Sequence, residues 1–69
     1  MYFIKVIFRD GKGGFINCDK ITAVADYNGP YLEGLNSTIY TDGYAWHVKE
    51  DKLTIMKTLE YFCGVRYFI

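Results

Sequence analysis

The sequence predicts an α+β fold: a small, mostly antiparallel sheet of four to five strands with one C-terminal helix packed on one face. Two patterns carry this prediction, a β-hairpin signature around Asp42-Gly43 and a helical spacing of apolar residues that begins directly after it. With 69 residues, the chain is expected to form a single small globular domain over residues 1–69.

The first part of the chain predicts three strands. Along residues 2–8, alternate side chains are apolar or aromatic and share one face: Tyr2, Ile4, Val6 and Phe8. Glycines in the segment 10–14 interrupt this pattern and residues 15–18 resume it, so the first two strands should form a hairpin with a bulged connection. Residues 17–19 predict a turn or a short helical twist, and residues 21–26 predict a third strand.

Residues 37–48 predict a hairpin with a two-residue turn. Asp42-Gly43 suits a type I′ turn because both central residues need a positive φ, which Asp tolerates and Gly adopts freely. The register that follows pairs residues across the hairpin: Thr41 with Tyr44, Ile39 with Trp46, and Ser37 with Val48. One face then offers three apolar side chains to the core: Ile39, Trp46 and Val48. The other face carries the remaining residues: Thr38, Tyr40, Ala45 and His47.

The segment after this hairpin predicts a helix. Asp51 is a good N-cap, and apolar side chains follow within residues 52–63 at three- to four-residue spacing: Leu53, Met56, Leu59 and Phe62 or Cys63. Gly64 is a natural end for this helix. The hydrophobic tail Val65–Ile69 is expected to form either a last strand or a docking segment.

The loop of about ten residues between the third strand and the hairpin is long for a compact domain. Its apolar side chains could fold back over the core as a lid or stand out as a contact surface: Tyr27, Tyr31, Leu32 and Leu35. The sequence leaves both alternatives open.

Composition and charge narrow the functional classes. Eight basic residues balance eight acidic ones, which gives a net charge of zero and disfavours generic binding to nucleic acid. Aromatic residues make up 19% of the chain, and a neutral, aromatic-rich small domain favours a protein partner or self-association. The apolar N-terminus reaches Arg9-Asp10 too early for a signal or membrane segment, so we expect a cytoplasmic protein that does not bind a membrane.

The residue types do not predict an enzyme, a cofactor or a metal site. His47 is the single histidine, and the hairpin register places it across from Thr38 on a face where we expect it to be solvated. Cys18 and Cys63 are expected to be reduced, partly buried thiols, and together with His47 they lack the paired spacing of metal ligands. Residues 11–14 lack the glycine spacing and the Lys-Ser or Lys-Thr ending of a phosphate-binding loop, which indicates a hairpin turn instead.

Two segments of the chain carry a resemblance to a known family: Phe15–Ile21, which follows an N-terminal strand and turn, and Thr41–Glu50, which precedes the helix. Over about residues 2–60 the chain resembles the FlbD-like proteins of bacteria and phages. That resemblance implies a short, β-rich domain with a C-terminal helix, a link to flagellar and swarming motility, and no catalytic residues. The loop of residues 27–36 and the aromatic tail after Gly64 depart from the family pattern.

Together these observations predict a non-enzymatic protein-binding module, a small bacterial or phage regulator or inhibitor that acts through direct protein–protein contact. Tyrosine is enriched at interface hot spots, and the expected contact residues are Tyr27, Tyr31, Tyr40 and Tyr67. One alternative is nucleic-acid binding through a set of basic residues: Lys5, Arg9, Lys12 and Lys20. Another is self-assembly into a homo-oligomer, in which an edge strand or the tail completes the sheet of a neighbouring copy.

Overall fold

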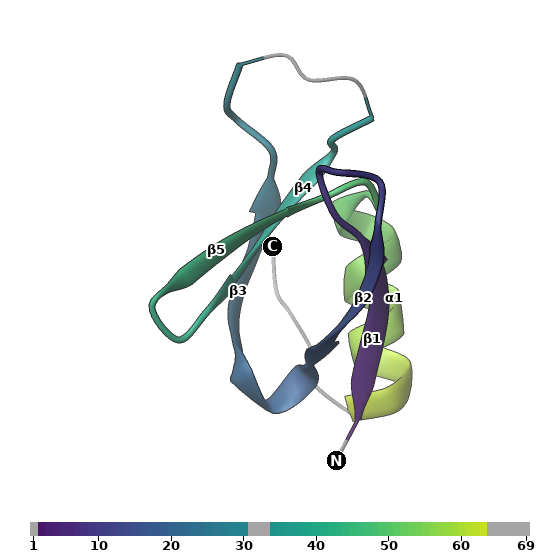
Figure 1. Ribbon diagram of the computed structural model, residues 1–69. Coiled ribbons are helices and arrows are strands. Elements are labelled where there is room, and N and C mark those ends of the chain that lie inside the picture. The colour runs from purple at the N-terminus through teal and green to yellow at the C-terminus, as the bar shows by residue number, and fades with distance from the viewer. Residues whose placement is uncertain (1, 31–33, 64–69) are drawn as a thin grey trace.

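The computed structural model describes residues 2–30 and 34–63 and confirms the predicted α+β class, with five antiparallel strands and one C-terminal helix (Figure 1). The elements follow one another in chain order: β1 (Phe3–Ile7), β2 (Gly13–Asn17), the 3₁₀ turn η1 (Cys18–Lys20), β3 (Ile21–Asp26), β4 (Ser37–Thr41), β5 (Tyr44–Val48) and α1 (Lys52–Cys63). The strands form two sheets, one of β1 and β2 and one in the order β3-β4-β5. The predicted single sheet is therefore divided in two.

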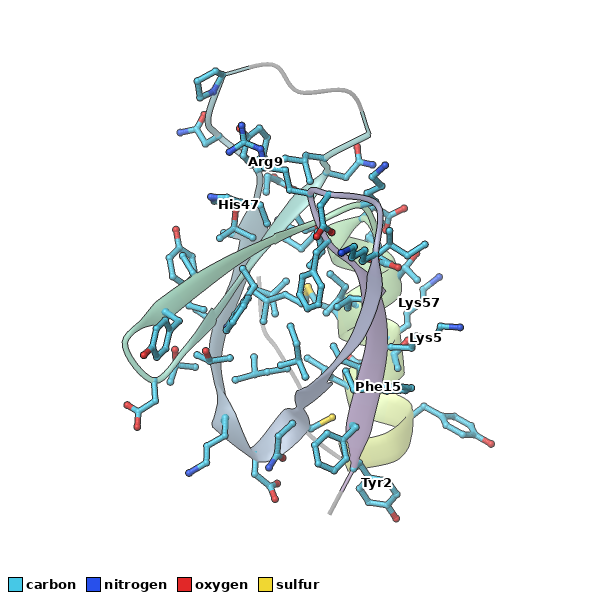
Figure 2. The ribbon with its side chains drawn as sticks, in the orientation of Figure 1. Tyr2, Lys5, Arg9, Phe15, His47 and Lys57 are labelled. Atoms are coloured by element: carbon cyan, nitrogen blue, oxygen red, sulfur yellow. The ribbon has the colours of Figure 1, made fainter. Side chains whose placement is uncertain are left out.

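The β1–β2 hairpin turns through three residues after Phe8. The Gly11 N–H donates to the Phe8 carbonyl at 2.9 Å and the Phe8 N–H donates to the Lys12 carbonyl at 2.9 Å. Gly11 has a φ of +85°, which is the left-handed residue that a bulged three-residue hairpin loop requires. The predicted bulged connection is confirmed. Phe15 and Lys5 are exposed on the outer side of this hairpin (Figure 2).

The chain leaves β2 through the short turn η1, as the sequence predicts. The Asn17 side-chain oxygen accepts the Asp19 N–H at 2.9 Å and so caps this turn. β3 then pairs with β4, with a register shift between Ile21 and Ala23. Thr22 lies in this irregularity, and its hydroxyl donates to the Tyr40 carbonyl at 3.2 Å.

The β4–β5 hairpin has the predicted register, with Thr41 opposite Tyr44 and Ile39 opposite Trp46. The predicted turn type is wrong. Gly43 has a φ of +80°, but no non-glycine residue in the described segments has a positive φ, so Asp42 does not. A positive φ at Gly43 without one at Asp42 matches a type II turn, in which only the second central residue needs a positive φ. Gly43 supplies it, so Asp42 keeps an ordinary conformation.

The two sheets meet where β1 ends beside β5. Phe8 forms an isolated antiparallel bridge with Val48, and the Lys49 N–H donates to the Ile7 carbonyl at 2.9 Å. The Ile7 N–H in turn donates to both carboxylate oxygens of Glu50, at 3.0 and 3.1 Å. Backbone and side chain together thus hold the end of β1 against the end of β5.

The helix α1 begins after Asp51, which is the predicted N-cap. The Asp51 carboxylate accepts the Thr54 N–H at 2.7 Å, and this bond lowers the pKa of Asp51 below its ordinary value of 3.8. The predicted buried face is partly wrong, because Leu53 is 59% exposed. Met56 and Leu59 are buried as predicted, and Ile55 takes the place of Leu53 on the buried face. The helix is rotated so that this stripe, and not Leu53, meets the sheets.

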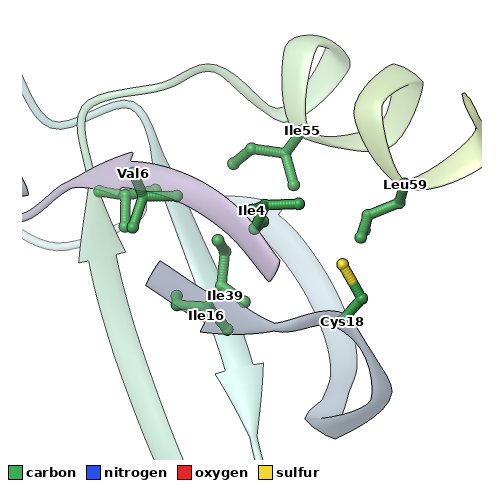
Figure 3. Packing of buried hydrophobic residues seen from close by; sticks show 8 residues of the cluster. Ile4, Val6, Ile16, Cys18, Ile39, Ile55 and Leu59 are labelled. Atoms are coloured by element: carbon green, nitrogen blue, oxygen red, sulfur yellow. The ribbon is translucent and has the colours of Figure 1, made fainter. Parts of the chain in front are cut away.

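The core lies between the two sheets and α1, and each of these layers contributes side chains to it (Figure 3). Its buried members are Ile4, Val6, Ile16, Cys18, Ile39, Val48, Ile55 and Leu59. Cys18 is buried as a thiol, as predicted for this residue. Trp46, which the hairpin pattern assigns to the core, is 39% exposed because it lies on the edge strand of its sheet. Tyr2, expected on the inner face of β1, is 54% exposed.

The long loop after β3 is confirmed, and its two ends lie against the body of the domain. The Tyr27 N–H donates to the Asn36 carbonyl at 3.0 Å, and Leu35 is buried. Asn36 also donates through its side-chain nitrogen to the Lys49 carbonyl at 2.7 Å. The residues Tyr31, Leu32 and Gly64, and the predicted tail segment, lie outside the described residues.

Candidate functional site

A hollow lies beside the edge strand β5. It is open to solvent, has a volume of about 550 Å³, and is lined by Phe8, Arg9, Asp10, Ala45, Trp46 and His47. Three of these residues follow the end of β1 and three are consecutive in β5. The hollow therefore lies in the fork where the β1–β2 turn leaves the edge of β5, and Figure 2 shows Arg9 and His47 near this end of the molecule.

Aromatic rings form one wall of this hollow. The Phe8 ring lies 5.7 Å from the Trp46 ring, and the Tyr44 ring lies 5.9 Å from it on the other side, measured between centroids. The Trp46 indole N–H donates to the Thr41 hydroxyl at 2.8 Å, which holds the indole in place. Tyr44 is 68% exposed. Ring contacts and this hydrogen bond thus hold the row of Phe8, Trp46 and Tyr44 together at the protein surface.

Gly14 allows the Phe8 ring to reach this position. A Cβ atom at Gly14 would lie 2.2 Å from Cε2 of Phe8, which is closer than any real carbon contact. Gly14 is opposite Val6 in the β1–β2 hairpin, so the ring of Phe8 lies over the backbone of β2. A residue with no side chain is required here for packing and not for backbone conformation.

On the other face of the sheet, His47 is part of a small polar cluster. The Thr38 hydroxyl and His47 Nδ1 are 2.9 Å apart, as the predicted pairing of these residues requires. The Tyr27 ring meets the His47 ring edge-on, with centroids 5.1 Å apart. His47 is half-buried, so it is less exposed than the sequence predicts, but it lines a hollow that is open to solvent. The Tyr27 ring and the Thr38 hydroxyl together orient the imidazole.

The structure describes two of the four predicted contact tyrosines, Tyr27 and Tyr40. Tyr27 is half-buried and its hydroxyl donates to the Pro30 carbonyl at 2.8 Å. Tyr40 is 43% exposed on β4, on the same face as Thr38. Tyr31 and Tyr67 lie outside the described residues. Both described tyrosines thus belong to the His47 face, whereas the aromatic row of Tyr44, Trp46 and Phe8 lies on the opposite one.

The four predicted basic residues do not gather at one place. Arg9 and Lys12 belong to the β1–β2 turn, whereas Lys20 belongs to η1 at the opposite end of that hairpin. Lys5 lies between these ends, on β1. All four are exposed. Only Arg9 lines the hollow.

The described residues contain no group of three or more His, Cys, Asp or Glu side chains that could hold a metal ion. Cys18 lies in the core cluster, whereas His47 lies on the outer face of β5 beside Tyr27. The side chain of Cys63 lies outside the described set.

The sequence pattern assigned Trp46 to the core, so it did not predict that Trp46 and Tyr44 form one exposed aromatic surface. Two aromatic residues at alternate positions beside a turn indicate one exposed or buried aromatic face. Whether that face is covered depends on the neighbouring strand, which the local pattern does not contain.

The comparisons with known proteins complete the description of the site. A scan against protein-family models finds no matching model, and searches of curated proteins and of solved structures find no match. Within residues 2–30 and 34–63, none of the helices is long and apolar enough to cross a membrane.

Proposed function

We propose that this chain is a non-enzymatic protein-binding module that acts in the cytoplasm as a regulator or inhibitor through direct contact. The observation that supports it best is the row of Phe8, Trp46 and Tyr44 beside an open hollow on an edge strand. Tryptophan and tyrosine are enriched among residues that carry binding energy. Ordered rings also lose little conformational freedom on binding, which favours affinity.

The contact surface that we propose joins this row to the exposed tyrosine of the opposite face. Tyr40 presents a ring on β4, and Tyr27 orders His47 at the rim of the hollow. Tyr31 and Tyr67 stay predictions for the same contact. A resemblance to the FlbD-like proteins likewise stays a prediction, and a partner among regulatory or motility proteins would fit it.

The separated positions of the basic residues argue against nucleic-acid binding as the main function. A protein that follows a phosphate backbone needs a continuous basic groove. Arg9 and Lys20 lie at opposite ends of the β1–β2 hairpin with Lys5 between them, so these four side chains are not gathered into one patch. Protein binding remains the function that the geometry supports best.

Affinity capture with matched variants tests this proposal. The tagged chain is used to capture proteins from nuclease-treated bacterial lysate, beside the variants Tyr44→Ser and Phe15→Ser. These two aromatic residues are matched in exposure, at 68% and 69%, but they lie on different sheets. We expect wild type and Phe15→Ser to recover one dominant protein in a fixed ratio, and Tyr44→Ser to lose most of it.

Two results would contradict the proposal. Recovery of the bait alone, with a monomer or oligomer measured by light scattering, would indicate that no protein partner exists in that lysate and would favour self-assembly if the bait is oligomeric. Equal loss by both variants would show that capture depends on general surface hydrophobicity and not on this surface.

A further inference from the structure

The backbone of β5 presents unused hydrogen-bonding groups at the hollow. Because the turn has two residues, Thr41 and Tyr44 form a hydrogen-bonded pair. Hydrogen-bonded and non-hydrogen-bonded pairs alternate along an antiparallel ladder, so the next pair, Tyr40 and Ala45, is of the second kind. The N–H and C=O groups of Ala45 therefore point away from β4, toward the outer edge. Lys49 is an even number of residues after Ala45, so its N–H points to the same side. It donates to the Ile7 carbonyl of β1, on the outer side of β5, and this confirms the direction.

The outer edge of β5 is paired at one end and open at the other. Its C-terminal end meets β1 through the bridge between Phe8 and Val48, after which the chain turns back at Gly11. In the part of the chain that the structure describes, no hydrogen bond to the outer side of Ala45 is made. An edge with such groups is a template for one more strand.

The side chains around this edge define the chemistry of a suitable strand. Residues paired with Tyr44 and Trp46 would project onto the aromatic face, so apolar side chains at alternate positions would meet the rings. The Arg9 guanidinium has no hydrogen-bond or ion-pair partner among the described residues. The neighbouring Asp10 carboxylate already accepts the Lys12 N–H at 2.9 Å. The fork thus holds one positive and one negative charge, and of the two only the Arg9 guanidinium lacks a partner, so an acidic residue in the ligand could pair with it.

We propose that the open edge of β5 binds an extended segment of a partner protein, with apolar residues at alternate positions and one acidic residue, as an added antiparallel or parallel strand. Backbone bonds to Ala45 align the segment, alternate apolar side chains pack on Trp46 and Tyr44, and an acidic side chain meets Arg9 where β1 closes the edge. This inference rests on the proposed protein-binding function and specifies the form in which the partner binds.

Selection of peptides on the folded protein tests the inference directly. A displayed library of random peptides is panned against the full chain, and the consensus peptide is synthesised. Trp46 is the only tryptophan, so its fluorescence reports binding at this edge. We expect a consensus with apolar residues at alternate positions and at least one acidic residue toward one end. Failure to enrich any consensus, or a basic consensus, would overturn the inference.

Backbone pairing is tested on the peptide, which leaves the protein unchanged. The consensus peptide is N-methylated in turn at each amide, because a methyl group removes one donor without altering the side chains. Methylation at the position that donates to the Ala45 carbonyl should weaken binding about tenfold, and methylation at the next amide should have a much smaller effect. Equal affinities for all methylated peptides would exclude strand addition.

The positive charge is tested with two matched variants. Arg9→Glu should weaken the consensus peptide about tenfold or more, whereas Lys20→Glu, at the other end of the hairpin, should not. Equal effects of both variants would show long-range attraction only and would overturn the site. A single-stranded oligonucleotide that binds more tightly than the peptide and is weakened by both variants would also overturn it in favour of nucleic acid.

The two proposals fail in different ways. If Tyr44→Ser loses the captured protein but N-methylation and Arg9→Glu leave peptide binding unchanged, the protein-binding function stands and strand addition is wrong. If lysate capture recovers the bait alone and panning enriches no consensus, the protein-binding function itself is wrong.

Discussion

The strands β4 and β5 are paired residue for residue, yet the first three residues of β4 are buried and the first three of β5 are exposed. Ile39 of β4 is 0% exposed, whereas its direct partner Trp46 on β5 is 39% exposed. The difference arises because β4 pairs with a strand on both sides, β3 and β5. β5 pairs with β4 on one side, and on its other side it meets β1 only through the bridge between Phe8 and Val48. A central strand can bury an apolar side chain completely, whereas an edge strand with the same pattern leaves part of it exposed.

The largest expected contrast between these strands is in stability. Ile39→Ala on β4 should lower the free energy of unfolding by about 3 kcal/mol, because it leaves a cavity in a fully buried site. Tyr44→Ser on β5 should change it by no more than about 0.5 kcal/mol. Urea denaturation monitored by far-UV circular dichroism measures both. A large loss for Tyr44→Ser would show that the exposed end of β5 contributes to stability as the buried strand does.

Gly14 in β2 gives a second test of this contrast, because the Phe8 ring that packs on Gly14 also contacts Trp46. Gly14→Ala should cost about 2 kcal/mol, since its new methyl group displaces the Phe8 ring. Gly13→Ala is the matched control, because a Cβ atom there would come no closer than 3.8 Å to a neighbour. We expect a red shift of Trp46 fluorescence for Gly14→Ala alone. Identical spectra for both variants would contradict the packing of Phe8 on Gly14.

The smallest expected effect lies just after β5, where Asp51 begins α1. The Thr54 N–H lowers the pKa of Asp51 in the folded protein, so the carboxylate stabilises the fold above the unfolded pKa, and this stabilisation is lost as pH falls through the folded pKa, below 3.8. The melting temperature of Asp51→Ala should therefore lie below that of wild type near neutral pH and approach it in strong acid.

Asp51→Asn is the control for this pH effect. Its amide oxygen still accepts the Thr54 N–H but does not titrate, so this variant should retain its capping bond in acid while wild type loses part of it. A melting temperature difference between wild type and Asp51→Ala that is the same at neutral and acid pH would show that the carboxylate charge has no role.

Much of the fold was predictable because it depends on neighbours in the sequence. The third strand, the helix after Asp51 and the register from Thr41 opposite Tyr44 all agree with the structure. Alternation, capping and turn length set these features within a few residues. The site was less predictable: Tyr40, a predicted contact residue, is exposed, but Trp46 was assigned to the core and is exposed as well.

The remaining features were decided by contacts between segments distant in sequence. The sheet divides in two because β1 meets β5 only around Phe8 and Val48, and the helix turns Ile55 inward because that side faces the strands. The sequence by itself determined the elements and the pairing within each hairpin, since those interactions are local. Only the tertiary structure decided which strand lies at an edge and which aromatic rings stay exposed, because burial depends on what else packs against each face.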